Sequence, residues 1–392
     1  MKKLLAAALL LLFALCAQCA LGEETARDIT AECVITSSAG HVNAMTDGNY
    51  ATYWKFDVAH TITVELPEGE EPGGVYLEWF WEDAEYTVSQ YGADGELLKE
   101  QTEQDFIRGI ETWHPLEPQT RRVKFLIEGG GRVCEIHVYG SGALPPQVHP
   151  WQAPPETADV LLFVAHQDDE ELWFGGLLPY YGPVRDETVQ VVYMTSCNRF
   201  RRAEALNGLW AMGLTEYPEF INFEDRAIGR KAAIENWGGE NNILDRMVSA
   251  IRRYKPAVIV THDVNGEYGH IQHVLTAHYL PQAVRVAAGT AYTRSYNLYG
   301  SWQTQKLYNH LGEENVICMD WNEPSEKLGG RTPLQAACDG FACHLTQLDR
   351  YSMDIDPRYD NSKFSLAYSL VGEDAEKNDF LENIDLAALR GR

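Results

Sequence analysis

Two short segments of the chain carry side chains of the kinds that bind metal ions and move protons. They read Ala-His-Gln-Asp-Asp-Glu over residues 165–170 and Asn-Gly-Glu-Tyr-Gly-His-Ile-Gln-His over residues 265–273. A catalytic zinc ion takes about three ligands from His, Asp and Glu and keeps an open position for water. Histidine and aspartate at a spacing of three residues can meet in a turn or on one helix face. The two segments together therefore favour a metal site.

Each candidate residue has a distinct expected place in that site. His166 and Asp169 are candidate ligands, because a turn between strand and helix can bring both to one point. His270 and His273 share one face of an expected helical turn, so one can bind the metal while the other faces the substrate. Asp168 is free to take a proton from water. The structural alternatives are an acidic helix cap and an incidental His-x-x-His pair.

Expected strands precede both segments. An apolar run over residues 159–164 leads into the first, and residues 257–261 lead into the second. Continuous apolar runs are typical of strands covered on both faces. Further elements are a strand over residues 189–194 and helices near residue 170 and over residues 202–212 and 242–254. This alternation predicts an α/β fold with a doubly wound parallel sheet, in which ligands bind at the carboxyl ends of strands.

A proline-rich stretch over residues 143–156 reads as an extended linker. The part before it looks all-β, with short alternating runs between turn signals at residues 61–66, 75–81, 123–127 and 133–139. Strands at this spacing predict a β-sandwich. We therefore expect an all-β sandwich domain over residues 23–142 and an α/β domain over residues 157–392.

Residues 1–22 read as a cleaved signal peptide. Two lysines come first, an apolar run too short for a membrane span follows, and small residues end the segment. We therefore expect a secreted or extracytoplasmic protein with no stable membrane span. Cys16 and Cys19 raise the alternative of a lipid anchor, which is less favoured because the residue before each cysteine is not small.

The composition narrows the class of partner. The chain has 57 acidic and 32 basic residues, a formal net charge of −25 at pH 7. A surface this acidic disfavours nucleic acid and anionic membranes. The apolar fraction of 45% is that of a globular protein with sizeable cores.

The two segments resemble the PIG-L/LmbE family of zinc-dependent de-N-acetylases, whose pattern is A-H-P-D-D-E followed later by G-H-x-D-H. A third piece, Arg201-Arg-Ala-Glu204 followed by Ala211-Met-Gly213, looks like the Arg-x-x-Glu helix of that family. The resemblance covers roughly residues 157–350. It implies a Rossmann-like, LmbE-like sheet and a hydrolase that removes the acetyl group from an N-acetylated amino sugar of the N-acetylglucosamine type.

Roles follow from the resemblance by position. The implied zinc ligands are His166, Asp169 and His273. Asp168 looks like the general base, and His270 looks like the residue that stabilises the oxyanion and protonates the leaving amine. The implied substrate-binding residues are Arg201 and Tyr268.

Two positions depart from the family pattern. Gln167 replaces a proline, which should alter the stiffness of the turn more than its chemistry. Gln272 replaces the aspartate between the two histidines. An aspartate there would favour a charged histidine, and glutamine offers no charge. We therefore expect His270 to be less readily protonated and the pH optimum to shift.

Residues 28–140 resemble a discoidin-type domain, the C-type β-sandwich of coagulation factors. The resemblance rests on the segment Met-Thr-Asp-Gly-Asn-Tyr-Ala-Thr-Tyr-Trp over residues 45–54 and on the closing segment 134–140. Such domains often bind sugars and can hold a structural calcium ion, for which Asp47 and Thr52 are the candidates. Candidates for a sugar-stacking face are Trp79, Phe80, Trp81 and Trp113, of which at least two are expected to be buried in the core, because aromatic residues that alternate along a strand are more often core. A disulfide is expected between Cys33 and Cys134.

Three functions are consistent with these features. The first is an extracellular glycan deacetylase with a carbohydrate-associated front domain. The second is a carbohydrate-binding protein whose hydrolase domain is weakly active or inactive, for which Gln272 is the warning sign. The third is a zinc amidase that acts on a non-sugar amide. Activity of the metal-loaded protein separates the first function from the second, and the identity of the product, acetate or not, separates the third.

Overall fold

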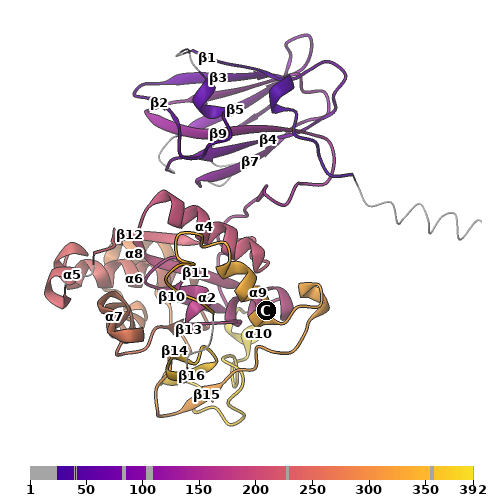
Figure 1. Ribbon diagram of the computed structural model, residues 1–392. Coiled ribbons are helices and arrows are strands. Elements are labelled where there is room, and N and C mark those ends of the chain that lie inside the picture. The colour runs from indigo at the N-terminus through magenta and orange to yellow at the C-terminus, as the bar shows by residue number, and fades with distance from the viewer. Residues whose placement is uncertain are drawn as a thin grey trace, which may run out of the picture. The chain divides into compact units, whose positions relative to one another are not determined.

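Two compact units, Met1–Trp151 and Gln152–Arg392, make up the chain in the computed structural model (Figure 1). The residues described are 24–38, 40, 42–81, 85–102, 109–226, 229–353 and 357–391. The expected signal peptide, residues 1–22, lies outside them. Within the described residues, no helix is long and apolar enough to span a membrane.

The first unit is a β-sandwich of two antiparallel sheets. Their strand orders are β1-β3-β8-β5-β6 and β2-β9-β4-β7. The strands are β1 Val34–Ser37, β2 Trp54–Phe56, β3 His60–Glu65, β4 Pro72–Trp79, β5 Tyr86–Tyr91, β6 Leu97–Gln101, β7 Glu111–Pro115, β8 Arg122–Ile127 and β9 Gly131–Gly140, with single helical turns at η1 Thr30–Glu32 and η2 Asn43–Met45. Alternating residues such as Val123, Phe125 and Ile127 of β8 are buried between the sheets.

The structure of this unit bears on three expectations from the sequence: the aromatic face, the disulfide and the linker. Trp79 is only 2% exposed and belongs to the core, so it is not free to stack on a sugar. Cys33 and Cys134 are not joined in a disulfide. Part of the expected linker is packed rather than extended, because Val148 and Trp151 are buried.

A seven-stranded mixed sheet lies at the centre of the second unit. Its order is β12-β11-β10-β13-β14-β16-β15, and the first five strands are parallel. Strands β15 and β16 run antiparallel, which the expected all-parallel, Rossmann-like sheet did not include. The strands are β10 Val160–Val164, β11 Val189–Ser196, β12 Glu219–Glu224, β13 Val258–Thr261, β14 Lys306–His310, β15 Val316–Cys318 and β16 Lys363–Ser369.

Helices cover this sheet, and β10 is buried along its whole length (Figure 1). Leu161 and Phe163 pack against α6 and α7 in one core, while alternate residues of β10 are buried on the other face. Ile243, Met247 and Ile251 form the buried stripe of α6, as their spacing predicts. The helices are α2 Asp169–Leu172, α3 Leu177–Pro179, η3 Tyr180–Val184, α4 Arg199–Ala211, α5 Arg230–Asn236, α6 Glu240–Tyr254, η4 Glu267–Gly269, α7 Ile271–Ala287, α8 Thr293–Tyr299, η5 Glu326–Leu328, α9 Pro333–Phe341, η6 Pro357–Tyr359 and α10 Leu386–Leu389.

The strand order places a natural crevice at β10. From β10 the chain adds β11 and β12 on one side, and then crosses to add β13 and β14 on the other. Such a reversal leaves a crevice at the carboxyl ends of the central strands. The two segments singled out in the sequence, residues 165–170 and 265–273, follow the ends of β10 and β13.

Candidate metal and catalytic site

The turn between β10 and α2 presents the first segment at the carboxyl edge of the sheet. Strand β10 ends at Val164 and α2 begins at Asp169, so residues 165–168 make the turn. Asp168 adopts a φ of 122°, a region that L-residues rarely occupy, and its backbone N–H donates to Glu170 Oε2 at 3.0 Å. Strain of this kind persists where surrounding contacts hold it, as at active sites. The turn therefore fixes where the Asp168 side chain leaves the backbone.

The three side chains expected to bind a metal ion converge. His166 Nδ1 lies 3.1 Å from His273 Nε2 and 3.2 Å from Asp169 Oδ2. His273 Nε2 lies 3.3 Å from Asp169 Oδ1. Ligands at roughly 2.0–2.1 Å from a tetrahedral zinc ion stand about 3.3 Å apart. The spacing of the three groups thus matches a metal centre.

The outer ring nitrogens show which atoms are left for a metal. His166 Nε2 lies 2.8 Å from Gln272 Oε1 and 3.4 Å from Asp225 Oδ1. His273 Nδ1 lies 2.7 Å from Glu267 Oε2. Because these partners accept hydrogen bonds, each ring carries its proton there and directs a lone pair toward the other ring. Two lone pairs that meet beside a carboxylate need a cation between them, so the residues fit a metal ion.

Asp169 is held in place by donors from two directions. The backbone N–H of His166 donates to Asp169 Oδ2 at 2.7 Å, and Trp173 Nε1 donates to Oδ1 at 2.9 Å. Burial alone would raise the pKa of Asp169. The nearby histidines, His273 first, outweigh it and hold that pKa well below its usual range. Asp169 is therefore ionised, as a metal ligand must be.

Glu267 is a buried carboxylate shared by three histidines, and the sequence analysis missed it. Besides the contact with His273, His262 Nδ1 lies 2.8 Å from Glu267 Oε2 and His310 Nδ1 lies 2.6 Å from Oε1. His262 follows β13, and His310 is the last residue of β14. The signal that would have found this group is a histidine at the end of each of two parallel strands, at one edge of the sheet.

Three sets of side chains place their ligand atoms close enough together to hold an ion: Asp169, His262 and His273; His166, His270 and His273; and Glu170, Glu171 and His344. His262 is not available as a ligand, because its Nε2 accepts from the Ala165 N–H at 2.9 Å and its Nδ1 donates to Glu267. His270 Nδ1 is buried without a hydrogen-bond partner. His270 is therefore the group beside the metal set that is still able to contact a substrate.

Gln272 contacts a different histidine from the one expected. The sequence predicted an effect on His270, but Gln272 accepts from His166, and its amide donates to Glu224 O at 3.1 Å. Burial, the largest cause, together with the neighbouring imidazoles of His166 and His273, lowers the pKa of His270 to about 4. Burial, and not Gln272, therefore sets the protonation of His270.

Asp168 and Arg201 form an ion pair next to the metal set. Arg201 Nη2 lies 2.9 Å from Asp168 Oδ1, and it also donates to the carbonyl of Gln167. Arg201 is placed by the start of α4, where the Asn198 side chain accepts from two backbone N–H groups. Burial raises the pKa of Asp168 to about 7, against the opposing charge of Arg201. A carboxylate with that pKa is suited to proton transfer at neutral pH.

A second acidic group lies next to this turn. Glu170, Glu171 and His344 are fully buried, and His344 Nε2 lies 3.4 Å from Glu171 Oε2. Burial raises the pKa of Glu170 to about 8. Because Glu170 accepts from the Asp168 N–H, its structural effect is to hold the strained turn.

A cavity of about 180 Å³ opens onto these groups. Arg201, Tyr268 and His270 line it, as expected for substrate-facing residues. Besides Leu172 and Trp173 next to the first segment, four further lining residues were not predicted: Asp225, Gln347, Arg350 and Tyr351. They follow β12 and α9, in segments with no recognisable motif.

The comparisons with known proteins bear on the second unit. Residues 161–284 match the family model PIG-L, described as GlcNAc-PI de-N-acetylase. A 1D-myo-inositol 2-acetamido-2-deoxy-alpha-D-glucopyranoside deacetylase from Mycobacterium leprae is 29% identical over 167 residues, or 35% of this chain and 53% of the relative. The enzyme of the same name from Rhodococcus erythropolis is 29% identical over 191 residues, or 40% of this chain and 62% of the relative. The chain thus spans just over half the length of these relatives.

Two solved structures resemble parts of the chain at low TM-scores. The conserved protein TT1542 from Thermus thermophilus has a TM-score of 0.36 at 15% identity and covers 49% of this chain and 80% of its own. The family 32 CBM from C. perfringens NanJ, in complex with galactose, has a TM-score of 0.23 at 15% identity and covers 29% and 98%. The stretch that matches the PIG-L family model, residues 161–284, contains both segments of the site.

Proposed function

We propose that the second unit is a zinc-dependent hydrolase that removes the acetyl group from an N-acetylated amino sugar of the N-acetylglucosamine type, in a glycan or glycoconjugate. The observation that carries the proposal is the set of three side chains, His166, Asp169 and His273, whose ring nitrogens and carboxylate oxygens face one another at 3.1–3.3 Å. The relatives, which are named as deacetylases of an acetamido sugar, support the substrate class.

His166, Asp169 and His273 would hold the zinc ion. When bound, zinc supplies Lewis-acid chemistry, in which it polarises a carbonyl and makes water more acidic. The protein holds the two rings by their outer nitrogens, through Gln272 on one side and Glu267 on the other. Such outer partners fix the tautomer and direction of each ligand.

Asp168 is the proposed general base. Its carboxylate accepts a proton from the attacking water and then passes that proton to the leaving amine, so that acetate and a free amino group are formed. The pKa of about 7 allows both steps near neutral pH. Arg201 keeps the carboxylate in place through the 2.9 Å contact.

His270 is the proposed oxyanion partner. With a pKa lowered to about 4, the ring is neutral at pH 7, so it donates a hydrogen bond and is not the source of the amine's proton. A donor aimed at the developing negative charge is among the strongest contributions to amide hydrolysis. Tyr268, which is 47% exposed, is proposed to flank the sugar ring together with Trp173, whose ring centroid lies 5.8 Å away.

The test is acetate release from a panel of N-acetylated amino sugars by the zinc-loaded protein. The panel contains free N-acetylglucosamine, a glycoside of it, an N-acetylated oligosaccharide and an N-acetylated peptide. We expect release from sugars, which an Asp168→Asn variant loses while it keeps its zinc. Asp186→Asn is the matched control, because Asp186 also has a positive φ, of 59°, but does not line the cavity. Release from the peptide alone would favour the amidase, and release from no member would favour the binding protein.

Two proposals concern the rest of the chain. Export through a signal peptide at residues 1–22 predicts a mature chain shortened by that segment, which intact mass measures. A calcium ion at Asp47 and Thr52 would have to displace existing contacts, because Thr52 Oγ1 donates to Asp47 Oδ2 at 2.8 Å and the Asn49 N–H donates to Oδ1 at 2.9 Å. An unchanged melting temperature on adding calcium after chelation would reject it.

A further inference from the structure

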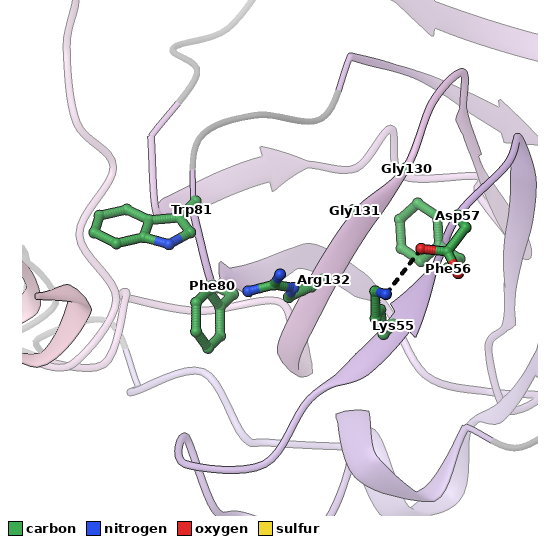
Figure 2. A pocket seen from close by; sticks show the side chains of 8 residues that line it. All are labelled: Lys55, Phe56, Asp57, Phe80, Trp81, Gly130, Gly131 and Arg132. Atoms are coloured by element: carbon green, nitrogen blue, oxygen red, sulfur yellow. Dashed lines mark ion pairs between the residues drawn. The ribbon is translucent and has the colours of Figure 1, made fainter.

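A pocket of about 190 Å³ in the first unit is lined by aromatic and charged side chains (Figure 2). Lys55 comes from β2, Asp57 follows it, Phe80 and Trp81 follow β4, and Arg132 comes from β9. The volume corresponds to roughly six water molecules at about 30 Å³ each. The pocket therefore has room for one sugar ring or a molecule of similar size.

Arg132 is held by aromatic rings. Its guanidinium carbon lies 4.6 Å from the centroid of the Phe80 ring and 5.5 Å from that of Tyr53. The Phe80 and Tyr53 rings themselves meet edge to face at 4.9 Å. Figure 2 shows the Arg132 guanidinium beside Phe80, on the side of the pocket that faces Lys55. Stacking on rings orients a guanidinium without using its N–H donors.

Arg132 differs in this respect from the other described arginines of the unit. Arg27 pairs with Glu32 and Glu70, Arg122 pairs with Glu65, and Arg121 donates to backbone carbonyls. Within the described residues, no carboxylate pairs with Arg132 and no oxygen accepts from its guanidinium. Among the described residues, Arg132 is thus an oriented cation without an acidic partner, and such a cation is suited to bind an external anion.

The second cation of the pocket is already paired. Lys55 Nζ lies 2.9 Å from Asp57 Oδ1, and both side chains are more than half exposed. Counting the described residues alone, the pocket thus offers one positive charge without an acidic partner, which matches a ligand group with a single negative charge. A carboxylate has that charge and accepts two parallel hydrogen bonds from a guanidinium. A polyanion is disfavoured by the net charge of −25.

We propose that this pocket binds a carboxylate-bearing sugar residue, of the uronic acid class, with the carboxylate on Arg132 and the apolar face of the ring against Phe80 and Trp81. The choice of a sugar as the carrier of the carboxylate rests on the proposed function of the second unit. The aromatic faces of the pocket are suited to the C–H face of a sugar ring.

The test compares matched pairs of ligands on the full-length protein by calorimetry. The pairs are methyl glucuronoside with methyl glucoside, and methyl galacturonoside with methyl galactoside. We expect one acid to bind about tenfold or more tightly than its neutral partner, as a charge-assisted pair would provide. Arg132→Gln should remove this preference, Arg132→Lys should keep part of it, and Phe80→Leu should weaken the binding of both members of the pair.

Arg122→Gln is the matched control, because Arg122 also lies over an aromatic ring, Tyr91, but outside the pocket. It should bind as the wild type does. Equal binding of acid and neutral sugar, binding of neither, or an unchanged preference in Arg132→Gln would overturn the proposal. Acetate or phosphate that competes as well as the acidic sugar would also overturn it, since the pocket would then be a general anion site. Asp168→Asn should keep the binding, so a failed deacetylase assay and a failed pocket remain distinguishable.

Discussion

The two units hold their charged groups in opposite ways. In the second unit, the polar groups at the cavity are held by one another: Glu267 binds three histidines, and Asp168 is paired with Arg201. In the first unit, Arg132 is held by Phe80 and Tyr53, which leave its donors open. Paired groups, as in the second unit, hold the catalytic side chains in position before a substrate binds. An oriented charge such as Arg132 can instead form its hydrogen bonds with a ligand.

Removal of the metal should give the largest difference between the activities of the two units. After dialysis against a chelator, acetate release should fall by about a hundredfold or more, because a metal supplies several kcal/mol of transition-state stabilisation. Binding of the acidic sugar should not change, since Arg132 needs no ion. Both are measured on one sample, before and after zinc is restored. Acetate release that survives in protein shown to be metal-free would break the comparison.

The next largest effect should come from Glu267→Gln. An amide cannot accept hydrogen bonds through both of its terminal atoms, so the ring of His273 or of His310 loses its partner. We expect zinc affinity to fall about 10–100-fold, the usual cost of an outer partner of a metal ligand. Competition with a chromophoric chelator measures this without any activity assay. Glu326→Gln, at η5 and outside the cavity, is the control. An unchanged zinc affinity would mean that the ligands hold their geometry unaided.

A smaller effect on zinc affinity and kcat is expected from a change at Asp225, one of the two acceptors near His166 Nε2. Asp225 is the only carboxylate near His166 Nε2 within the described residues, at 3.4 Å, because Gln272 is neutral. Asp225→Asn should lower zinc affinity and kcat about tenfold, at the low end for such partners. Gln272→Asp in the same chain should restore both by returning a carboxylate to the ring. If the double variant is as weak as Asp225→Asn alone, Asp225 acts on the substrate and not through His166.

The smallest effect concerns stability and a buried histidine of the first unit. Burial lowers the pKa of His114 to about 3, below its usual 6.5. Between these pH values His114 is protonated in the unfolded chain and neutral in the folded chain. His114 therefore lowers the free energy of unfolding as pH falls from about 6.5 to 3, by up to about 1.4 kcal/mol per unit. His114→Gln should flatten this dependence in denaturant titrations, and His60→Gln, at a partly exposed position, should not. The prediction would be contradicted if the free energy of unfolding changed with pH in the same way for the wild type and His114→Gln.

Local spacing was enough to find the residues nearest the expected chemistry. His166, Asp168 and Asp169 follow one strand and His270 and His273 follow another, so the sequence and the strand order bring them together. The roles of these residues nevertheless remain proposals. The strands β3, β4, β8, β9, β10, β11 and β13 were also expected, because each is an apolar or alternating run.

What could not be predicted depends on contacts between distant segments. Glu267 gains its importance from His262 and His310, which reach it only because β13 and β14 are neighbours in the sheet. Arg132 reads as an ordinary surface charge until the turn after β4 brings Phe80 against it. The antiparallel strands β15 and β16 lie at the end of the sheet, where short strands carry a weak pattern.

The packed end of the first unit also decides where the protein should be divided for separate study. Val148 is 2% exposed and packs with Tyr76 and Tyr139, and Trp151 Nε1 donates to Glu111 at 3.4 Å. A truncation at residue 142, where the proline-rich stretch begins, would strip this covering and leave apolar surface in water. A boundary between Trp151 and Gln152 keeps it, so the isolated first unit should be expressed with residues 143–151 of the proline-rich stretch.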